Sequence, residues 1–324
     1  MTRAIRIHKN GPPSVMKWEE VEIGKPKKGE VRLRQTAIGL NFIDTYFRAG
    51  LYPQPLPLIL GSEGAGVVEA LGGGVTGLKV GDRVAYAGGP IGSYAEQRLI
   101  PARHLIKIPK EISDQTAAAM MLKGMTARYL LRDTYRVKKG DTILVHAAAG
   151  GLGLILCQWA SHLGVTVIGT VSSKQKADLA KAHGCHHLII YTKQNFVDRV
   201  KRLTKGAGVQ VVYDSIGKDT FPASLDCLQK RGLFVSFGNA SGPLPPFVTG
   251  ILTQKGSLYM TRPSLFDYVG TRPELEANAR DLISMVKKGV VKIEINQTYA
   301  LKDAARAHRD LEGRKTTGST VLQP

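Results

Sequence analysis

The sequence is poor in cysteine and lacks long hydrophobic runs, and each shortage excludes a class of protein. Its 324 residues hold three cysteines, Cys157, Cys185 and Cys227, an odd and widely spaced set. Such a set argues against a disulfide framework and favours a reducing compartment, which we expect to be the cytoplasm. No stretch approaches the roughly 20 apolar residues of a membrane span, and residues 1–10 lack the apolar run of a signal peptide. We therefore expect no membrane contact.

Acidic residues are outnumbered, with 26 Asp and Glu against 45 Lys and Arg, so the net charge is +19. The basic residues occur singly or in short clusters, which favours a solvated basic surface over a dedicated anionic partner. Aromatic residues make up only 6% of the chain, and no nucleic-acid-binding module is present. The composition therefore supports a nucleic-acid contact only through surface charge.

The middle third alternates apolar strands with helices. A strand at 141–146 precedes a glycine loop, and a helix with one apolar face follows and ends at Gly164. Further strands are predicted at 165–171, 187–190, 209–213, 232–237 and 257–260, and further helices at 174–183, 195–203 and 219–230. This alternation predicts a doubly wound parallel sheet.

The first 115 or so residues and the tail have a different pattern. Short strands at 4–8, 30–38, 64–70, 83–86 and 94–100 are separated by Gly/Pro turns, which predicts an all-β unit such as a barrel. The tail is predicted to contain helices at 273–288 and 302–311 and strands at 291–295 and 319–322. Because the tail has no complete core of its own, we expect it to pack on the first domain.

The clearest motif is HAAAGGLG at residues 146–153, between a predicted strand and a predicted helix. Small residues let the backbone approach a pyrophosphate, and the first N–H groups of the helix favour its negative charge. The loop departs from the strict G-x-G-x-x-G pattern, but its place in a βαβ unit supports a dinucleotide site. The alternative is that the glycines only permit a tight turn and close packing.

The end of the next strand distinguishes the two nicotinamide dinucleotides. An NAD site has an Asp or Glu there, about 20 residues past the glycines, to bind the ribose hydroxyl. Here residues 171–176 read VSSKQK, with two hydroxyls, two lysines and no carboxylate. This composition suits a 2′-phosphate and predicts NADPH. The alternative is that the lysines only begin a surface helix.

A second group of polar residues lies at 41–46 (NFIDTY), followed by Arg48 and by GLYP at 50–53. Its amide, carboxylate and phenol groups either line a small-molecule cleft or belong to a polar loop between barrel strands.

With GDRV at 81–84, LKGMT at 122–126, VYDSIG at 212–217 and GSLYMTRPSL at 256–265, these segments resemble the medium-chain dehydrogenase/reductase superfamily. The resemblance is to its zinc-independent quinone oxidoreductase, or zeta-crystallin-like, branch, and it extends over nearly the whole chain in order.

The resemblance implies an α/β fold with a GroES-like β-barrel catalytic domain and a doubly wound parallel-sheet Rossmann domain. Residues 1–118 and 265–324 would form the first domain and residues 119–264 the NADPH-binding one, with the cofactor in a cleft at their junction. A homodimer would form largely through the Rossmann domains. Asn41, Tyr46 and Tyr52 would be catalytic and face the quinone. The residues implied to contact NADPH are Asn41, Phe42, Ile43, Asp44, Thr45, Tyr46, Tyr129, Gly151, Leu152, Ser172, Ser173, Lys176, Tyr191, Ser215, Phe237, Gly238, Asn239, Met260, Thr261, Arg262 and Arg314.

No metal is expected. Zinc-dependent relatives have Gly-His-Glu where this chain has Gly61-Ser62-Glu63, and a ligand cysteine where it has Asn41. Adjacent residues of Cys185-His186-His187 would point to opposite faces of a strand. Without zinc to polarise a carbonyl, the acceptor must take hydride unaided, as quinones do. The expected reaction is hydride transfer from NADPH to a quinone, with a tyrosine or a water supplying the proton.

Two other functions stay open. A zinc-free enone or alkenal reductase would share the cofactor loop, so only a panel of substrates separates it from a quinone reductase. An RNA-binding or structural relative of zeta-crystallin is compatible with the charge of +19. Any such RNA affinity would fall steeply with salt.

Overall fold

The computed structural model describes residues 1–324 and divides into two compact units. Unit one comprises Met1–Met125, Tyr268–Lys287 and Ile293–Pro324, and unit two comprises Thr126–Asp267 and Lys288–Lys292. Helix α2 (Asp114–Tyr129) begins in unit one and ends in unit two. None of the helices combines the length and apolar character that a membrane crossing requires.

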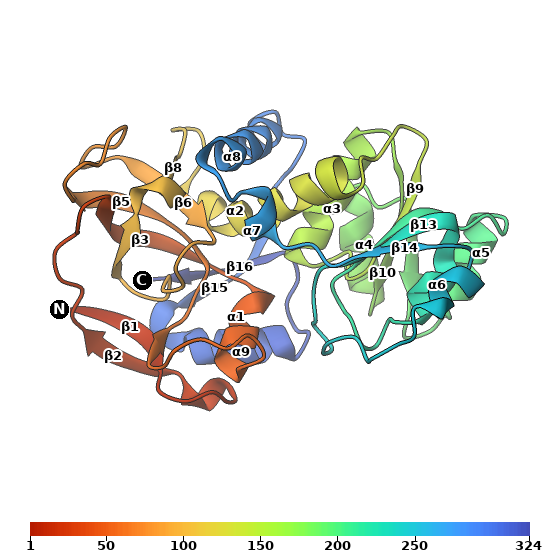
Figure 1. Cartoon of the computed structure of the whole chain (residues 1–324), viewed down its shortest axis with the longest axis horizontal. Coiled ribbons are helices and arrows are strands. Elements are labelled where there is room, and N and C mark those ends of the chain that lie inside the picture. Colours follow the sequence, from red (N-terminus) through yellow and green to blue (C-terminus); the bar gives the residue numbers. More distant parts are fainter. The chain divides into compact units, whose positions relative to one another are not determined.

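Unit two is built on a six-stranded parallel sheet with the order β11-β10-β9-β12-β13-β14 (Figure 1). The strands are β9 (Thr142–Val145), β10 (Thr166–Val171), β11 (His187–Ile190), β12 (Val209–Asp214), β13 (Leu228–Ser236) and β14 (Tyr259–Thr261); the helices are α3 (Gly151–His162), α4 (Lys174–Ala182), α5 (Phe196–Leu203), α6 (Gly250–Gln254) and the short α7 (Leu265–Tyr268). The inner strands β9, β10 and β12 are mostly aliphatic and buried, as in a sheet covered on both faces. The predicted doubly wound sheet is confirmed.

One predicted helix of unit two, over 219–230, is wrong. Pro222 interrupts this segment, since it has no N–H and cannot sit in a helix interior. Only a short 3₁₀ helix, η4 (Ala223–Cys227), forms there. Strand β13 then begins at Leu228, earlier than predicted. Its register with β12 shifts between the pairs Val209–Leu228 and Val211–Leu233, and Arg231, with a φ of 59°, lies within the shifted stretch.

Unit one contains a three-stranded sheet, β2-β1-β4, and a seven-stranded sheet, β15-β16-β3-β5-β6-β8, in which β7 also pairs with β3. The strands are β1 (Thr2–Ile7), β2 (Lys17–Val21), β3 (Glu30–Leu40), β4 (Leu58–Ile59), β5 (Glu63–Leu71), β6 (Arg83–Ala87), β7 (Gln97–Pro101), β8 (Ile106–Lys107), β15 (Ile295–Ala300) and β16 (Ser319–Gln323). The tail therefore supplies two strands, and β16 pairs antiparallel with the end of β3. The helices besides α2 are α1 (Phe42–Ala49), α8 (Arg272–Lys287) and α9 (Ala304–Glu312).

Two further predictions need correction. The strand predicted at 291–295 begins only at Ile295, as β15, because the backbone of Lys292 pairs with the side-chain amide of Gln158 rather than with another strand. The alternative of a polar loop at 41–46 is also wrong, because α1 begins there. Asn41 donates its backbone N–H to Asp44 at the third helical position, and Gly50, with a φ of 84°, ends the helix.

Strand β3 joins the two apolar cores of unit one. Its first half supplies Val31 and Leu33 to one cluster of buried residues, and its second half supplies Ile38 and Leu40 to the other. Helix α1 follows β3 directly and inserts Phe47 into the second cluster. The polar end of α1 is thereby fixed at the end of a buried strand.

Candidate active site

In unit two, the predicted NADPH contacts gather at one edge of the sheet. Ten of them lie in the segments that follow the parallel strands. They are Gly151 and Leu152 after β9, Ser172 and Ser173 after β10, Tyr191 after β11, Ser215 after β12, Phe237, Gly238 and Asn239 after β13, and Arg262 after β14. Met260 and Thr261 are within β14, Lys176 is in α4, and Tyr129 ends α2. The carboxyl edge of such a sheet is where nucleotides bind.

The glycine loop after β9 is closely packed. Ala147 has a φ of 54°, and Gly150 donates its N–H to the carbonyl of Ala147 at 2.9 Å. A Cβ on Gly153 would lie 2.4 Å from that same carbonyl oxygen, so no side chain fits there. No side chain caps the start of α3. Its first N–H groups are therefore suited to an anion.

The segment after β10 offers hydroxyls and cations and no carboxylate. The hydroxyl of Ser173 caps α4 by accepting from the backbone N–H of Lys176 at 3.3 Å. Lys174 forms an ion pair with Asp178 one turn further along. Ser172 and Lys176 are half-buried. Ser172, Lys176 and the start of α4 are the groups best suited to a ribose phosphate.

In unit one, Asn41 is the N-cap of helix α1, Tyr46 lies within the helix, and Tyr52 lies shortly after it. The rings of Tyr46 and Tyr52 meet edge to face with centroids 5.2 Å apart, and Phe42 lies 5.7 Å from Tyr46. Ile43 is half-buried, and Thr45 donates its hydroxyl to the carbonyl of Phe42 at 2.7 Å. Arg314 follows α9 and has a φ of 58°. It belongs to unit one, whereas most of the other predicted NADPH contacts belong to unit two.

Asp44 is fully buried at the centre of a directed chain of hydrogen bonds. Its carboxylate accepts from Ser62 Oγ at 2.7 Å and from Tyr94 Oη at 2.9 Å. Tyr94 in turn contacts His308 Nε2 at 3.0 Å, and Arg48 Nη1 donates to His308 Nδ1 at 2.9 Å. Burial raises the pKa of Asp44 to about 6, and burial together with the charge of Arg48 lowers the pKa of His308 to about 3. The protein thus favours a neutral imidazole beneath α1.

A second buried carboxylate, Glu63, lies on the other side of Asn41. Its oxygens accept from Asn41 Nδ2 at 2.8 Å and from the backbone N–H of Leu122 at 2.7 Å. The Lys123 ammonium lies 3.5 Å away. Burial raises the pKa of Glu63, and the charge of Lys123 is the largest opposing influence. The side-chain amide of Asn41 is therefore held in place by its hydrogen bond to Glu63.

Sequence patterns missed most of this scaffold. Lys123 stands in the LKGMT segment, but nothing in that segment signals a carboxylate partner sixty or so residues earlier. His308 and Arg48 are separated by 260 positions, and only the folded chain brings them together. In unit two, His146 is likewise buried between Thr170 Oγ1 and Ser224 Oγ, at 2.9 Å from each.

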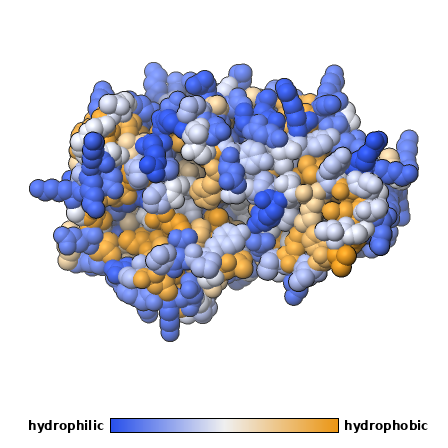
Figure 2. All heavy atoms as spheres, viewed as in Figure 1, coloured by the Kyte–Doolittle hydropathy of each residue, from blue (hydrophilic) through white to orange (hydrophobic).

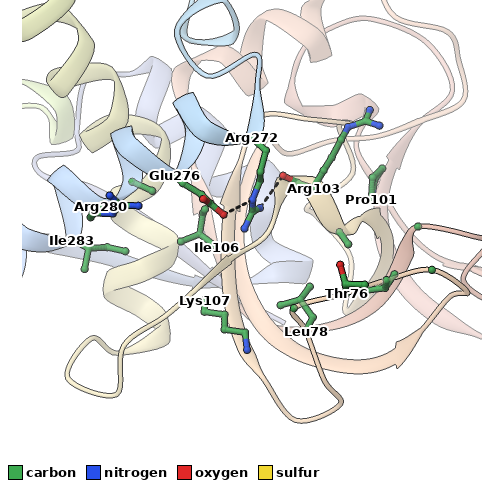
Figure 3. A pocket seen from close by; sticks show the side chains of 16 residues that line it. Thr76, Leu78, Pro101, Arg103, Ile106, Lys107, Arg272, Glu276, Arg280 and Ile283 are labelled. Atoms are coloured by element: carbon green, nitrogen blue, oxygen red, sulfur yellow. Dashed lines mark hydrogen bonds and ion pairs between the residues drawn. The ribbon is translucent and has the colours of Figure 1, made fainter.

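A separate hollow of about 860 Å³ opens in unit one between α8 and the loops around β7 and β8 (Figure 3). Its rim is basic, with Arg103, Lys107, Arg272 and Arg280 against Glu276. Arg272 extends from α8 to Glu276 and to the carbonyl of Arg103, as the dashed lines in Figure 3 show. None of the predicted site residues lines this hollow.

The described residues contain no group of three or more His, Cys, Asp or Glu side chains arranged to hold a metal ion. The side chains at the two positions compared with zinc ligands, Asn41 and Ser62, donate instead to Glu63 and Asp44.

Comparison with known proteins adds to this geometry. The alcohol dehydrogenase GroES-like domain matches residues 27–110, and the zinc-binding dehydrogenase domain matches residues 151–284. A quinone oxidoreductase of Pseudomonas aeruginosa is 55% identical, and a 2-haloacrylate reductase of a Burkholderia species is 50% identical; each alignment covers all of this chain and at least 99% of the relative. The crystal structure of Escherichia coli quinone oxidoreductase complexed with NADPH is 50% identical, covers 100% of both chains and has a TM-score of 0.98.

These matches extend over both units and include the glycine loop and α1. The GroES-like and Rossmann architecture predicted from the sequence is confirmed. The chain belongs to the medium-chain dehydrogenase/reductase superfamily, among its quinone oxidoreductases.

Proposed function

We propose that this chain is an NADPH-dependent quinone reductase that transfers a hydride from NADPH to a quinone without a metal. The observation that carries the proposal is the whole-chain match to a quinone oxidoreductase structure complexed with NADPH. The segment after β10, with serines and lysines in place of a carboxylate, independently favours a phosphorylated ribose.

The residues of unit two fit such a cofactor. The closely packed glycine loop and the uncapped start of α3 suit its pyrophosphate. Gly238 lets the segment after β13 pack closely on the segment after β12, since a Cβ there would lie 2.6 Å from the carbonyl oxygen of Ser215. When bound, NADPH supplies a hydride from its nicotinamide ring. The chain's part is to hold and orient the two reactants.

On the acceptor side, Asn41, Tyr46 and Tyr52 are the proposed contacts. A quinone gains negative charge on oxygen as it accepts hydride, so hydrogen-bond donors near that oxygen lower the barrier. The two phenols are such donors and can also deliver a proton. If Tyr46→Phe combined with Tyr52→Phe leaves kcat/KM within about twofold of the wild type, the phenols have no role in the reaction.

The proposal needs no Lewis acid, because a quinone accepts hydride unaided. Asn41 and Ser62 are already engaged as hydrogen-bond donors to buried carboxylates, and neither side chain is a thiolate or an imidazole. These residue types are poor zinc ligands.

The test is NADPH oxidation, followed at about 340 nm where the reduced ring absorbs, with 1,4-benzoquinone, 1,2-naphthoquinone and 2-alkenals as acceptors. We expect the quinones to be reduced fastest, NADH to be a poor donor, and a chelator to have no effect. A preference for NADH, or loss of turnover on chelation, would contradict the cofactor or the metal-free assignment.

A second candidate function is reduction of an activated carbon–carbon double bond. The relative named 2-haloacrylate reductase, 50% identical over the whole chain, favours it. Adding 2-chloroacrylate to the acceptor panel separates the two. A higher kcat/KM for this acceptor than for every quinone would support the second candidate.

We also propose a cytoplasmic homodimer formed through unit two. Strand β14 ends the six-stranded sheet, and Tyr259 and Val248 beside it are 61% and 82% exposed. Figure 2 shows apolar surface gathered over α6 near this edge. Sedimentation of the wild type and of the double variant Val248→Lys with Tyr259→Lys tests the dimer, because the added charges should dissociate it.

The cytoplasmic location is supported by the cysteines. All three are free and buried, as suits a reducing compartment.

A further inference from the structure

Lys123 is buried to a degree unusual for lysine. Only 9% of the residue is exposed, whereas lysines are almost never buried without a partner. Its ammonium lies 3.2 Å from the carbonyl oxygen of Leu40 and 3.5 Å from Glu63 Oε2. Both partners adjoin Asn41, one as its chain neighbour and the other through a hydrogen bond.

The ammonium of Lys123 is the cation that faces Glu63, and it favours the charged form of this carboxyl group. Its side chain is fully buried at the start of β5, and burial alone raises its pKa. The ammonium of Lys123 acts in the opposite direction and favours the carboxylate. An ionised Glu63 accepts hydrogen bonds more strongly than a protonated one. The strength of the contact between Glu63 and Asn41 therefore depends on Lys123.

The packing around this pair leaves little freedom. Asn41 Nδ2 contacts Glu63 Oε2 at 2.8 Å and the carbonyl of Gly39 at 3.4 Å. A Cβ on Gly39 would lie 2.4 Å from Glu63 Oε2 and 2.1 Å from the carbonyl oxygen of Ala118 in α2. The glycine thus lets β3, Glu63 and α2 approach one another closely, and the amide of Asn41 is held in one orientation.

We propose that Lys123 is a positioning residue for the reaction: through Glu63 it orients the side-chain amide of Asn41 toward the acceptor. This inference rests on the proposed function, in which Asn41 contacts the acceptor. Lys123 itself is assigned no contact with substrate or cofactor.

The first experiment compares Lys123→Met with Lys107→Met. Methionine keeps the length and helix propensity of lysine and removes the charge. Lys107 is exposed, forms an ion pair with Asp82 at 2.8 Å and serves as the matched control. For Lys123→Met we expect kcat with 1,4-benzoquinone to fall by about 10- to 100-fold, as a small misplacement near the reacting centre would cause. NADPH affinity should stay within about threefold, because most cofactor contacts lie in unit two.

The double variant Lys123→Met with Glu63→Gln separates orientation from simple loss of stability. The carbonyl oxygen of a glutamine can still accept from Asn41, although the backbone N–H of Leu122 then loses its acceptor, and no buried charge is left without a partner. We therefore expect kcat to recover at least several-fold from the single variant. No recovery, or kcat within about twofold of the wild type in Lys123→Met, would overturn the proposal. An equal loss in Lys107→Met would also overturn it.

A second readout does not depend on activity. The side-chain amide signals of Asn41 in an NMR spectrum are identified by their loss in Asn41→Asp. They should shift in Lys123→Met, return toward their original position in the double variant and stay fixed in Lys107→Met. If the wild type fails to oxidise NADPH with any quinone, the proposed function fails. These signals then still decide whether Lys123 orients Asn41, and unmoved signals would overturn that claim.

Discussion

Replacing His308 with glutamine should remove a large part of the acid sensitivity of unit one. Arg48 has only donor groups, so its contact with His308 makes Nδ1 an acceptor and leaves the imidazole proton on Nε2. That N–H donates to Tyr94, whose hydroxyl donates to Asp44. A protonated imidazole has no lone pair to offer Arg48. The neutral ring is therefore the form that fits.

The pKa of His308 sets the size of the effect. Burial first, and the charge of Arg48 second, lower it from 6.5 to about 3. The unfolded chain binds a proton at the ordinary pKa while the folded chain does not, so this contribution to stability is complete above pH 6.5 and is lost as pH falls toward 3. At about 1.4 kcal/mol per pKa unit, the loss reaches about 2 kcal/mol at pH 5 and about 5 kcal/mol below pH 3.

Urea unfolding of the wild type and of His308→Gln, at pH 8 and at pH 5, measures this difference. Glutamine can accept from Arg48 and donate to Tyr94, but it does not titrate. Between the two pH values, the wild type should lose about 2 kcal/mol of unfolding free energy relative to the variant. Asp44 is present in both proteins, so its own titration cancels. Equal pH dependence of the two proteins would refute the neutral imidazole.

Three other predictions concern the two halves of the candidate site. Gly153→Ala should abolish NADPH binding measured by calorimetry, because its Cβ would lie 2.4 Å from the carbonyl oxygen of Ala147 and would displace the loop. In Gly150→Ala the Cβ would lie 3.3 Å from the same oxygen, so the affinity for NADPH should fall by less than about tenfold. Asp44→Asn should remove a fall in unfolding free energy of about 2 kcal/mol as pH rises from 4 to 6, because burial raises the folded pKa of Asp44 to about 6 and the folded state keeps the proton longer. A variant with unchanged pH dependence would contradict this. Lys176→Met should raise the KM for NADPH by about tenfold and leave the KM for NADH unchanged; equal effects on both would exclude a role at the phosphate.

The parallel sheet could be predicted from the sequence because buried parallel strands are continuous apolar runs, which few other structures produce. Helix α1 was not predicted, although its signals are local: an Asn and an Asp three positions apart at its start, and a glycine at its end. Helix α2 was not predicted. The error at 219–230 arose because helical composition was given more weight than Pro222.

The parts of the candidate site that come directly after parallel strands were predictable from the sequence. The glycine loop and the segment after β10 lie where a βαβ pattern puts them. The polar scaffold under α1 was not predictable, because its pairs are distant in sequence. Glu63 meets Lys123, and Asp44 meets Tyr94, only once β3, β5 and α2 have packed. A single sequence shows that these residues are polar, but it does not show which of them meet.

The pairing of β16 with the end of β3 has a consequence for synthesis of the chain. The main segment of unit two is contiguous, so it can fold on the ribosome while the last strand is still unmade. Until β16 emerges, the stretch of β3 just before Asn41 has an open edge. Pairing of this edge therefore waits for the codons of β16, and a ribosome that stalls before them leaves Asn41 next to an unpaired strand.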